Sequence, residues 1–252
     1  MQEYLIGIAS YKRPNGVRTL DYLEGLGFPR ERILLSVQTE EDAHAYTESG
    51  VAKRVGRFLY SPATSAAGNR NTLLDSVPKK TRILLLDDDI IELQHLDKSQ
   101  KRGLKGIHDL CEFDNVVKTG FRLANKNQTV CFGVSGLQDG AWFMKPGVGT
   151  RNIVTTQFMG VCVTNLRFDG RFCPKEDYEF CCRVIMMYGS CIRLNEYAVK
   201  APKTSGGCSD IWKNKQRNKT VANAMCTIYP DIVRPNPNRG GEILMVRKKA
   251  QC

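Results

Sequence analysis

Residues 84–89 read Leu84-Leu85-Leu86-Asp87-Asp88-Asp89, an apolar run that stops at three consecutive carboxylates. An unbroken apolar run of this kind, which starts near Arg82, is typical of a strand buried on both faces. Adjacent acids repel one another, and a divalent cation such as Mg2+ or Mn2+ compensates this charge because hard cations take oxygen ligands. The stretch therefore predicts a metal site at the end of a buried strand, suited to a phosphorylated substrate. The alternative interpretation is a solvated turn whose acids cap the next segment.

Strand and helix patterns alternate before this stretch. Apolar runs predict strands over 4–9, 33–37 and 58–60, and helical spacing predicts helices over 17–26, 40–49 and 66–76. This alternation favours an α/β fold, with a mostly parallel central sheet flanked by helices. Ligands of such sheets bind beyond the carboxyl ends of the strands. Three polar stretches stand at these ends and are expected to converge: Ser10-Tyr11-Lys12-Arg13, Gln38-Thr39-Glu40 and Asp87-Asp88-Asp89.

The second half of the chain has a less regular order of strand and helix patterns. It predicts a helix over 108–124, a strand over 130–134, a long glycine-rich loop over 135–151, strands over 157–163 and 190–199, a basic helix from about Asn218 and a closing strand over 243–246. A loop of that length is more often functional than idle. A further helix begins after Pro174 with Glu176 and Asp177 in its first turn, where acids also suit the helix dipole without any other role. We find no repeat or linker, and predict a single domain with halves 1–100 and 101–252.

The composition and net charge limit the classes of partner that this protein can bind. A net charge of +11 implies a polyanion, with nucleic acid the first candidate and anionic lipid or a nucleotide-linked substrate the second. Solvated lysine runs that bind nothing are the alternative. The start of the chain does not resemble a secretion signal and no stretch has the length of a membrane span, which predicts a soluble, intracellular protein. Ten cysteines without a CxxC pair predict reduced, mostly buried thiols rather than disulfides or structural zinc.

Four separated motifs occur in a recognisable order. They are Ser10-Tyr11-Lys12-Arg13-Pro14, Gly68-Asn69-Arg70-Asn71, Leu86-Asp87-Asp88-Asp89, and Phe168-Asp169-Gly170-Arg171-Phe172 followed by Glu176-Asp177-Tyr178-Glu179-Phe180-Cys181-Cys182-Arg183. In this order and spacing the chain resembles GT-A fold glycosyltransferases of the family 2 type, over about residues 4 to 200. A weaker resemblance, based on 133–152 and 204–207, is to phage-type enzymes that glycosylate modified bases in DNA.

The resemblance implies a role for each matching residue. Ser10, Tyr11 and Arg13 would hold a nucleoside diphosphate, with Gln38 or Glu40 near the base and Arg70 on a phosphate. Asp87 would approach the ribose, Asp89 would bind Mn2+ or Mg2+, with Asp87 as a second ligand, and Asp88 would contribute to either role. One acid of the Glu176-Asp177 pair, by preference Asp177, would take the proton of the acceptor hydroxyl, as a carboxylate within hydrogen-bond reach can do.

One feature departs from the resemblance. Many metal-dependent members add a late histidine ligand, whereas His44, His95 and His108 all precede the acid pair and are expected at the surface or in packing. Ser209, Asp210 or water are the substitutes that the chain offers. Trp142 and Trp212 are candidates for stacking on a base or sugar, or for burial against the sheet.

The predicted function is metal-dependent, inverting transfer of a sugar from a nucleotide-sugar, by preference a UDP-sugar, to a hydroxyl. The weaker resemblance, together with the basic charge, implies a hydroxymethylated pyrimidine in phage DNA as the acceptor, presented flipped out or single-stranded in the host cytoplasm. The alternatives are transfer to a cell-surface polysaccharide or lipid-linked sugar, a non-catalytic nucleic-acid-binding module on the same scaffold, and a nucleotidyltransferase. We expect Asp89→Ala or Asp177→Asn to abolish transfer while the fold survives, and hydrolysis or transfer from any nucleotide-sugar in the presence of Mn2+ would exclude the binding module.

Overall fold

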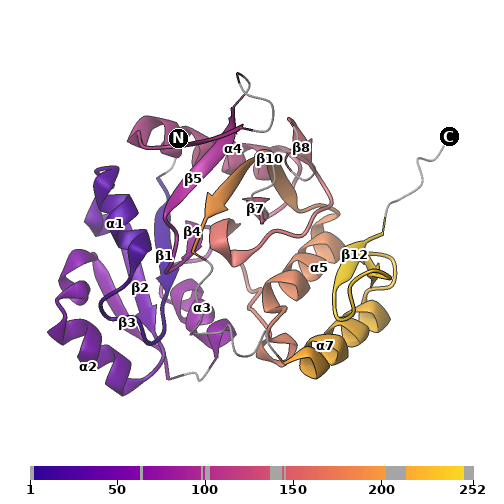
Figure 1. Cartoon of the computed structure of the whole chain (residues 1–252), viewed down its shortest axis with the longest axis horizontal. Coiled ribbons are helices and arrows are strands. Elements are labelled where there is room, and N and C mark those ends of the chain that lie inside the picture. Colours follow the sequence, from indigo (N-terminus) through magenta and orange to yellow (C-terminus); the bar gives the residue numbers. More distant parts are fainter. Residues whose placement is uncertain are drawn as a thin grey trace.

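The computed structural model describes residues 3–62, 65–97, 99, 103–136, 144, 146–202 and 214–246. Its core is a 10-stranded sheet with the order β3-β2-β1-β4-β9-β7-β10-β5-β6, in which β8 also pairs with β10 (Figure 1). The strands of this sheet are β1 (Leu5–Ala9), β2 (Ile33–Val37), β3 (Arg57–Tyr60), β4 (Arg82–Asp87), β5 (Glu92–Asp97), β6 (Gly103–Gly106), β7 (Cys131–Ser135), β8 (Val148–Gly149), β9 (Met159–Cys162) and β10 (Ile192–Lys200). The α-helices of the described residues are α1 (Arg18–Gly25), α2 (Glu40–Glu48), α3 (Ala66–Asp75), α4 (Leu110–Lys126), α5 (Glu176–Tyr188) and α7 (Lys215–Ile228). A separate hairpin pairs β11 (Val233–Pro235) with β12 (Ile243–Met245).

The first four strands of the chain form the parallel part of the sheet. β3, β2, β1 and β4 are neighbours in that order and all pair in parallel. Every residue of β2 is buried, which is the environment that consecutive apolar residues require. Ala9 of β1 is in register with Ser36 of β2 and with Asp87 of β4. The carboxyl ends of these strands therefore meet at one edge, and the predicted convergence of the polar stretches that follow them is confirmed.

Side-chain caps begin the helices that leave this edge. Thr39 Oγ1 accepts a hydrogen bond from the Asp42 amide at 3.0 Å, which starts α2. Ser65 Oγ accepts one from the Gly68 amide at 3.1 Å, which starts α3. Each cap satisfies an amide that has no partner within its helix. The role of Ser65 in the structure is therefore that of a cap at the start of α3.

Beyond β4 the sheet is mixed. β7, β10 and β6 run in the direction of the first four strands, whereas β9, β5 and β8 run against them. Most strands share one direction, as predicted. The strand predicted over 157–163 is shorter, because Thr156–Phe158 form a 3₁₀ turn before β9. The sequence does not predict β5 and β6, since polar residues such as Glu92 and Gln94 break the apolar pattern of β5.

Phe132 of β7 is central to the packing of the second half. Its side chain is fully buried, and its ring lies between Gly120 of α4 and Gly160 of β9, where any added Cβ atom would collide with it. The ring of Phe121 meets it edge on, with 4.8 Å between centroids. Helix α4 approaches the sheet this closely because both neighbours of the ring lack a side chain.

The last part of the described chain packs on α5. We call α7 and the β11–β12 hairpin the C-terminal unit; it lies beside α5 in Figure 1. Val221 and Met225 of α7 and Ile243 of β12 share one apolar cluster with Phe180 and Cys181 of α5. The cysteines of the described residues are free, and burial raises the pKa of the Cys181 thiol well above its ordinary value. None of the described helices combines the length and the apolar character that crossing a bilayer requires.

Candidate active site

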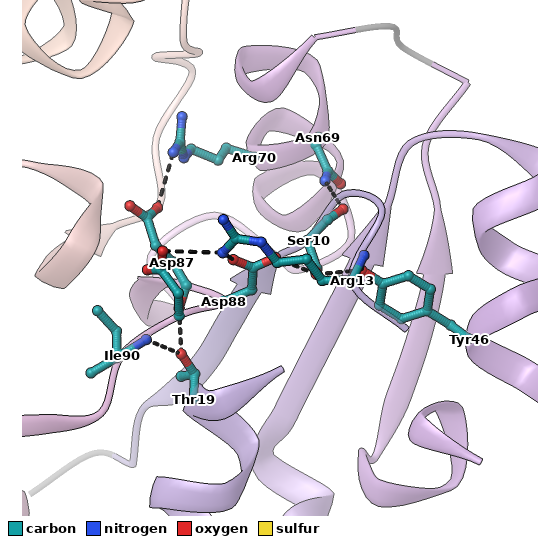
Figure 2. A network of polar contacts seen from close by, with 10 residues as sticks. Ser10, Arg13, Thr19, Tyr46, Asn69, Arg70, Asp87, Asp88 and Ile90 are labelled. Atoms are coloured by element: carbon teal, nitrogen blue, oxygen red, sulfur yellow. Dashed lines mark hydrogen bonds and ion pairs between the residues drawn. The ribbon is translucent and has the colours of Figure 1, made fainter. Parts of the chain in front are cut away.

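The middle acid of the triplet at the end of β4 faces inward. Asp88 is 8% exposed, Ser10 Oγ donates to its Oδ2 at 2.5 Å, and Arg13 Nη1 lies 2.6 Å from its Oδ1 (Figure 2). Burial raises the pKa of this carboxyl to about 6, although the bonds from Ser10 and Arg13 act in the opposite direction. Asp88 thus ties the end of β4 to the loop that follows β1.

Further hydrogen bonds hold the loop after β1. The hydroxyl groups of Ser10 and Tyr46 are 2.6 Å apart, and the Arg13 amide donates to Tyr46 Oη at 2.9 Å. Asn69 Nδ2 of α3 donates to the Ser10 carbonyl oxygen at 3.0 Å. Helices α2 and α3 therefore both fix the segment from Ser10 to Arg13 (Figure 2).

Arg70 connects the acids of β4 with those of α5. Its Nη2 lies 3.0 Å from Asp87 Oδ1, and its Nη1 lies 2.7 Å from Glu176 Oε1. Burial opposes the charge of this guanidinium, but Asp87 and Glu176 outweigh that effect and raise its pKa. The backbone oxygen of Asp87 also accepts a hydrogen bond from Thr19 Oγ1 at 2.6 Å, which fixes the strand end from the other side. The two acidic clusters thus lie together although some ninety residues separate them in the sequence.

A pocket of about 280 Å³ opens where these clusters meet. It is lined by Arg70, Asp87, Thr155, Thr156, Gln157, Cys173, Pro174, Glu176, Asp177 and Tyr178. Burial and the neighbouring charge of Glu176 raise the pKa of Asp177 to about 7. The Asp177 Oδ1 accepts a hydrogen bond from the Tyr178 amide at 2.8 Å, and Glu176 Oε2 is buried without a hydrogen-bond partner among the described residues. The pocket thus contains a carboxylate whose proton affinity is suited to proton transfer near neutral pH.

The donor set at the end of β4 fits a hard divalent cation. Asp87 and Asp89 offer carboxylate oxygens, the ligands that Mg2+ and Mn2+ prefer. The pKa of Asp89 is raised by burial and then by the charge of Asp87, so that the two carboxylates repel each other. A cation between them would remove this repulsion. Arg13, 3.1 Å from Asp89 Oδ2, supplies part of the compensation within the chain.

The remaining residues singled out in the sequence differ in exposure, and some of them are not described. Gln38 is buried after β2, Tyr11 carries the Lys12 ammonium over its ring at 5.0 Å, and Glu40 is exposed at the start of α2. The side chains of His44 and His108 are exposed. Ser209, Asp210, Trp142, Trp212 and the segment 204–207 lie outside the described residues.

Sequence reasoning missed three polar residues of the pocket, Thr155, Thr156 and Gln157. It placed Gln157 in a strand, where the side chain would pack against the sheet. The available signal was the run of three polar residues directly before an apolar strand, a pattern that marks a turn.

Comparison with known proteins shows which fold this is. No protein-family model matches the sequence, and no curated protein is a significant relative. Among solved structures, the chain is similar to a mannosyltransferase of Pyrobaculum calidifontis in complex with GDP-Man and Mn2+, with a TM-score of 0.58 at 12% identity, covering 92% of this chain and 65% of that one. It is also similar to M. tuberculosis glucosyl-3-phosphoglycerate synthase, with a TM-score of 0.55 at 8% identity over 93% and 85% of the two chains.

A third similar structure is S. aureus TarS, with a TM-score of 0.51 at 10% identity over 89% of this chain. The chain spans 40% of the length of TarS and 65% of that of the mannosyltransferase, so it corresponds to a part of each. At these identities the likeness concerns the course of the backbone. The fold of this chain is the GT-A fold of glycosyltransferases.

Proposed function

We propose that this protein transfers a sugar from a nucleotide-sugar to a hydroxyl group, with a divalent cation and with inversion at the anomeric carbon. The observation that carries the proposal is the convergence of Asp87, Glu176 and Asp177 on one pocket, with Arg70 between them. The fold supports it, since the similar mannosyltransferase was solved with GDP-Man and Mn2+.

The residues of the pocket divide the chemistry between them. Asp87 and Asp89 would hold Mn2+ or Mg2+, which when bound stabilises the charge of a departing diphosphate. The loop from Ser10 to Arg13 stands at the same strand edge, where a nucleoside diphosphate would lie, with Gln38 toward the base. Arg70 keeps its charge at any working pH, because its pKa is raised by its two acidic partners.

Asp177 is the general base of the proposed reaction. The acceptor O–H gives its proton to the Asp177 carboxylate while the acceptor oxygen attacks the anomeric carbon and the bond from this carbon to the diphosphate oxygen breaks. The leaving diphosphate keeps the electron pair of that bond. Attack from the side opposite the leaving group inverts the configuration, and a side-chain base facing the strand edge supports this geometry.

We further propose that the donor is a UDP-sugar and the acceptor a hydroxymethylated pyrimidine base in phage DNA. The net charge of +11 supports a polyanionic acceptor. The pocket of about 280 Å³ is too small for a base pair within its duplex, so the base would have to be flipped out or presented in a single strand.

A panel of nucleotide-sugars tests the proposal. The protein is incubated with Mn2+, with UDP- and GDP-hexoses, and with hydroxymethylated or unmodified DNA, and the products are weighed by mass spectrometry. We expect a gain of one hexose on the modified DNA alone. Asp177→Asn should abolish it, whereas Asp75→Asn, which changes an exposed carboxyl paired with Arg167, should retain it. Full activity of D177N would refute the site assignment, and transfer to another acceptor would correct the choice of DNA.

A further inference from the structure

The first turn of α5, which carries Glu176 and Asp177, and the residues just before it are in contact with the C-terminal unit. Three contacts reach them. Arg217 Nε of α7 donates to the Cys173 carbonyl oxygen at 2.9 Å, and Tyr229 Oη donates to Glu179 Oε1 at 2.6 Å. Between them, Lys175 Nζ lies 3.2 Å from Glu242 Oε2 of the segment that leads into β12. The anchored positions thus stand on both sides of the acid pair.

Lys175 is an unusual residue at this place. Its side chain is 0% exposed, whereas that of Glu242 is 35% exposed. An ammonium group out of contact with water is costly unless a charge and hydrogen bonds compensate it. Glu242 supplies part of this compensation, and the face of the Tyr178 ring, whose centroid is 5.4 Å from Nζ, supplies another part. The lysine therefore fixes the distance between the Glu242 segment and the start of α5 more tightly than an apolar side chain would.

The anchored residues belong to the wall of the pocket. Cys173, Pro174, Glu176, Asp177 and Tyr178 all line it, so that any shift of this turn moves the carboxylates within the pocket. Lys175 also starts the helix, since its carbonyl oxygen accepts the hydrogen bond of the Glu179 amide at 2.9 Å. The opposite wall, at Asp87, is held by Thr19, whose hydrogen bond to the Asp87 backbone oxygen involves neither α5 nor the C-terminal unit.

We propose that the Lys175–Glu242 ion pair is a positioning device: through it the C-terminal unit holds Asp177 within reach of the acceptor hydroxyl. This inference rests on the proposed function. Loss of the pair displaces the base but leaves the donor side, on β1 and β4, in place. Turnover then falls while the affinity for the nucleotide-sugar is retained, because a misplacement near 1 Å is enough to slow a reaction that depends on alignment.

The substitution Glu242→Gln tests this directly, because it keeps the shape of a partly exposed side chain and removes its charge. We expect kcat to fall about 10- to 100-fold, with the KM for the nucleotide-sugar within about twofold of the original value. Glu242→Asp, which keeps the charge, should restore part of the loss. Glu24→Gln is the matched control, since Glu24 of α1 forms an ion pair with Arg54, and the buried apolar residues of α1 belong to a different cluster from those of α5; its kcat should not change.

A double-mutant cycle tests the pairing itself. If Lys175 and Glu242 act together, the variant carrying both Lys175→Met and Glu242→Gln should lose no more turnover than Lys175→Met alone. Additive losses in the double variant, or an unchanged kcat in E242Q, would overturn the positioning role while leaving the transferase assignment intact.

Hydrogen exchange gives a readout that needs no turnover. The amides of Tyr178 and Glu179 should exchange faster in E242Q than in the unmodified protein, whereas those of α4 should keep their rates. This measurement remains decisive if no nucleotide-sugar is consumed by the unmodified protein, a result that would refute the proposed function alone. Equal exchange at Tyr178 and Glu179 in both proteins would refute the ion pair as the element that holds the turn.

Discussion

Arg70 is the residue that brings the two acidic clusters into one electrostatic unit. Asp87, Glu176 and Asp177 are carboxylates of a single pocket, and each would be costly to bury near the others without a cation. The guanidinium forms ion pairs with the first two at 3.0 and 2.7 Å. It has no ion pair with Asp177, whose pKa stays raised because burial and Glu176 outweigh the charge of Arg70. The arrangement thus separates one carboxyl with a high proton affinity from two that are paired with the guanidinium.

The proton affinity of Asp177 predicts the pH dependence of transfer. A general base works only when ionised, and the pKa of Asp177 is raised to about 7 by burial and Glu176. The rate constant kcat/KM should therefore rise tenfold per pH unit below about 7 and level off above it. A profile of kcat/KM between pH 5 and 9 measures this. The D75N protein should give the same profile, and a rate that is flat down to pH 5 would assign the proton to another group.

At this scale the sequence predicted which residues meet, though only where backbone topology decides it. Ser10 and Asp87 follow strands that are in register, so their proximity needs no knowledge of side chains. The pairing of Arg70 with Glu176 depends on how α5 packs, which no local pattern encodes over 106 positions. Thr155 and Gln157 were missed for another reason: the polar run before the strand marks a turn, but Gln157 was assigned to the strand.

Helix α4 and strand β9 lie closer to the Phe132 ring of β7 than residues with a Cβ atom would allow. Gly120 and Gly160 make this possible by leaving room for the ring of Phe132. The 3₁₀ turn Thr156–Phe158 precedes β9 directly and carries Thr156 and Gln157 into the pocket. The packing of Phe132 therefore sets the position of one wall of the candidate site.

Gly160→Ala tests this packing. The added methyl group would overlap the Phe132 ring, and we expect the free energy of unfolding to fall by about 1–3 kcal/mol, which is the usual cost of overpacking a core. Denaturant titration measures it. Gly25→Ala is the control, because no atom of the described residues lies near the added Cβ and the residue ends α1; its stability should change by less than about 1 kcal/mol. A G160A protein as stable as the original would mean that the ring has room to move.

Element boundaries were predictable where an apolar run or a cap stands in the sequence. β2 and the start of α2 agree with the prediction, because four of the five residues from Ile33 to Val37 are apolar and Thr39 is a strong cap. The hairpin of β5 and β6 escaped prediction because its strands are stabilised by pairing at a partly exposed sheet edge, with Glu92 and Gln94 in β5. Such strands depend on their neighbours more than on their own composition.

Considered as a whole, the molecule joins a fold shared with glycosyltransferases to a net charge of +11. Three acids, Asp87, Glu176 and Asp177, and one arginine, Arg70, line the pocket. The excess of positive charge therefore lies outside it. α7 contributes to it with the exposed residues Lys215 and Lys219, and this helix belongs to the unit that holds the first turn of α5. A polyanion bound along α7 would therefore lie next to the element that carries the proposed base.

This placement predicts how DNA binding should respond to salt. About four phosphate contacts would lower the affinity for duplex DNA roughly 100-fold between ~50 and ~200 mM salt, because each contact releases counterions.

Replacing Lys215 and Lys219 by Gln should weaken binding and reduce the slope of log K against log salt by about two, as one contact accounts for about one unit. A gel shift over a salt series measures both quantities. The matched control replaces Lys53 and Lys79, which are also exposed and precede β3 and β4, so that they stand at the sheet edge opposite the site. An equal loss in both double variants would show that the charge acts without a preferred face, and an affinity indifferent to salt would remove the reason for choosing DNA as the acceptor.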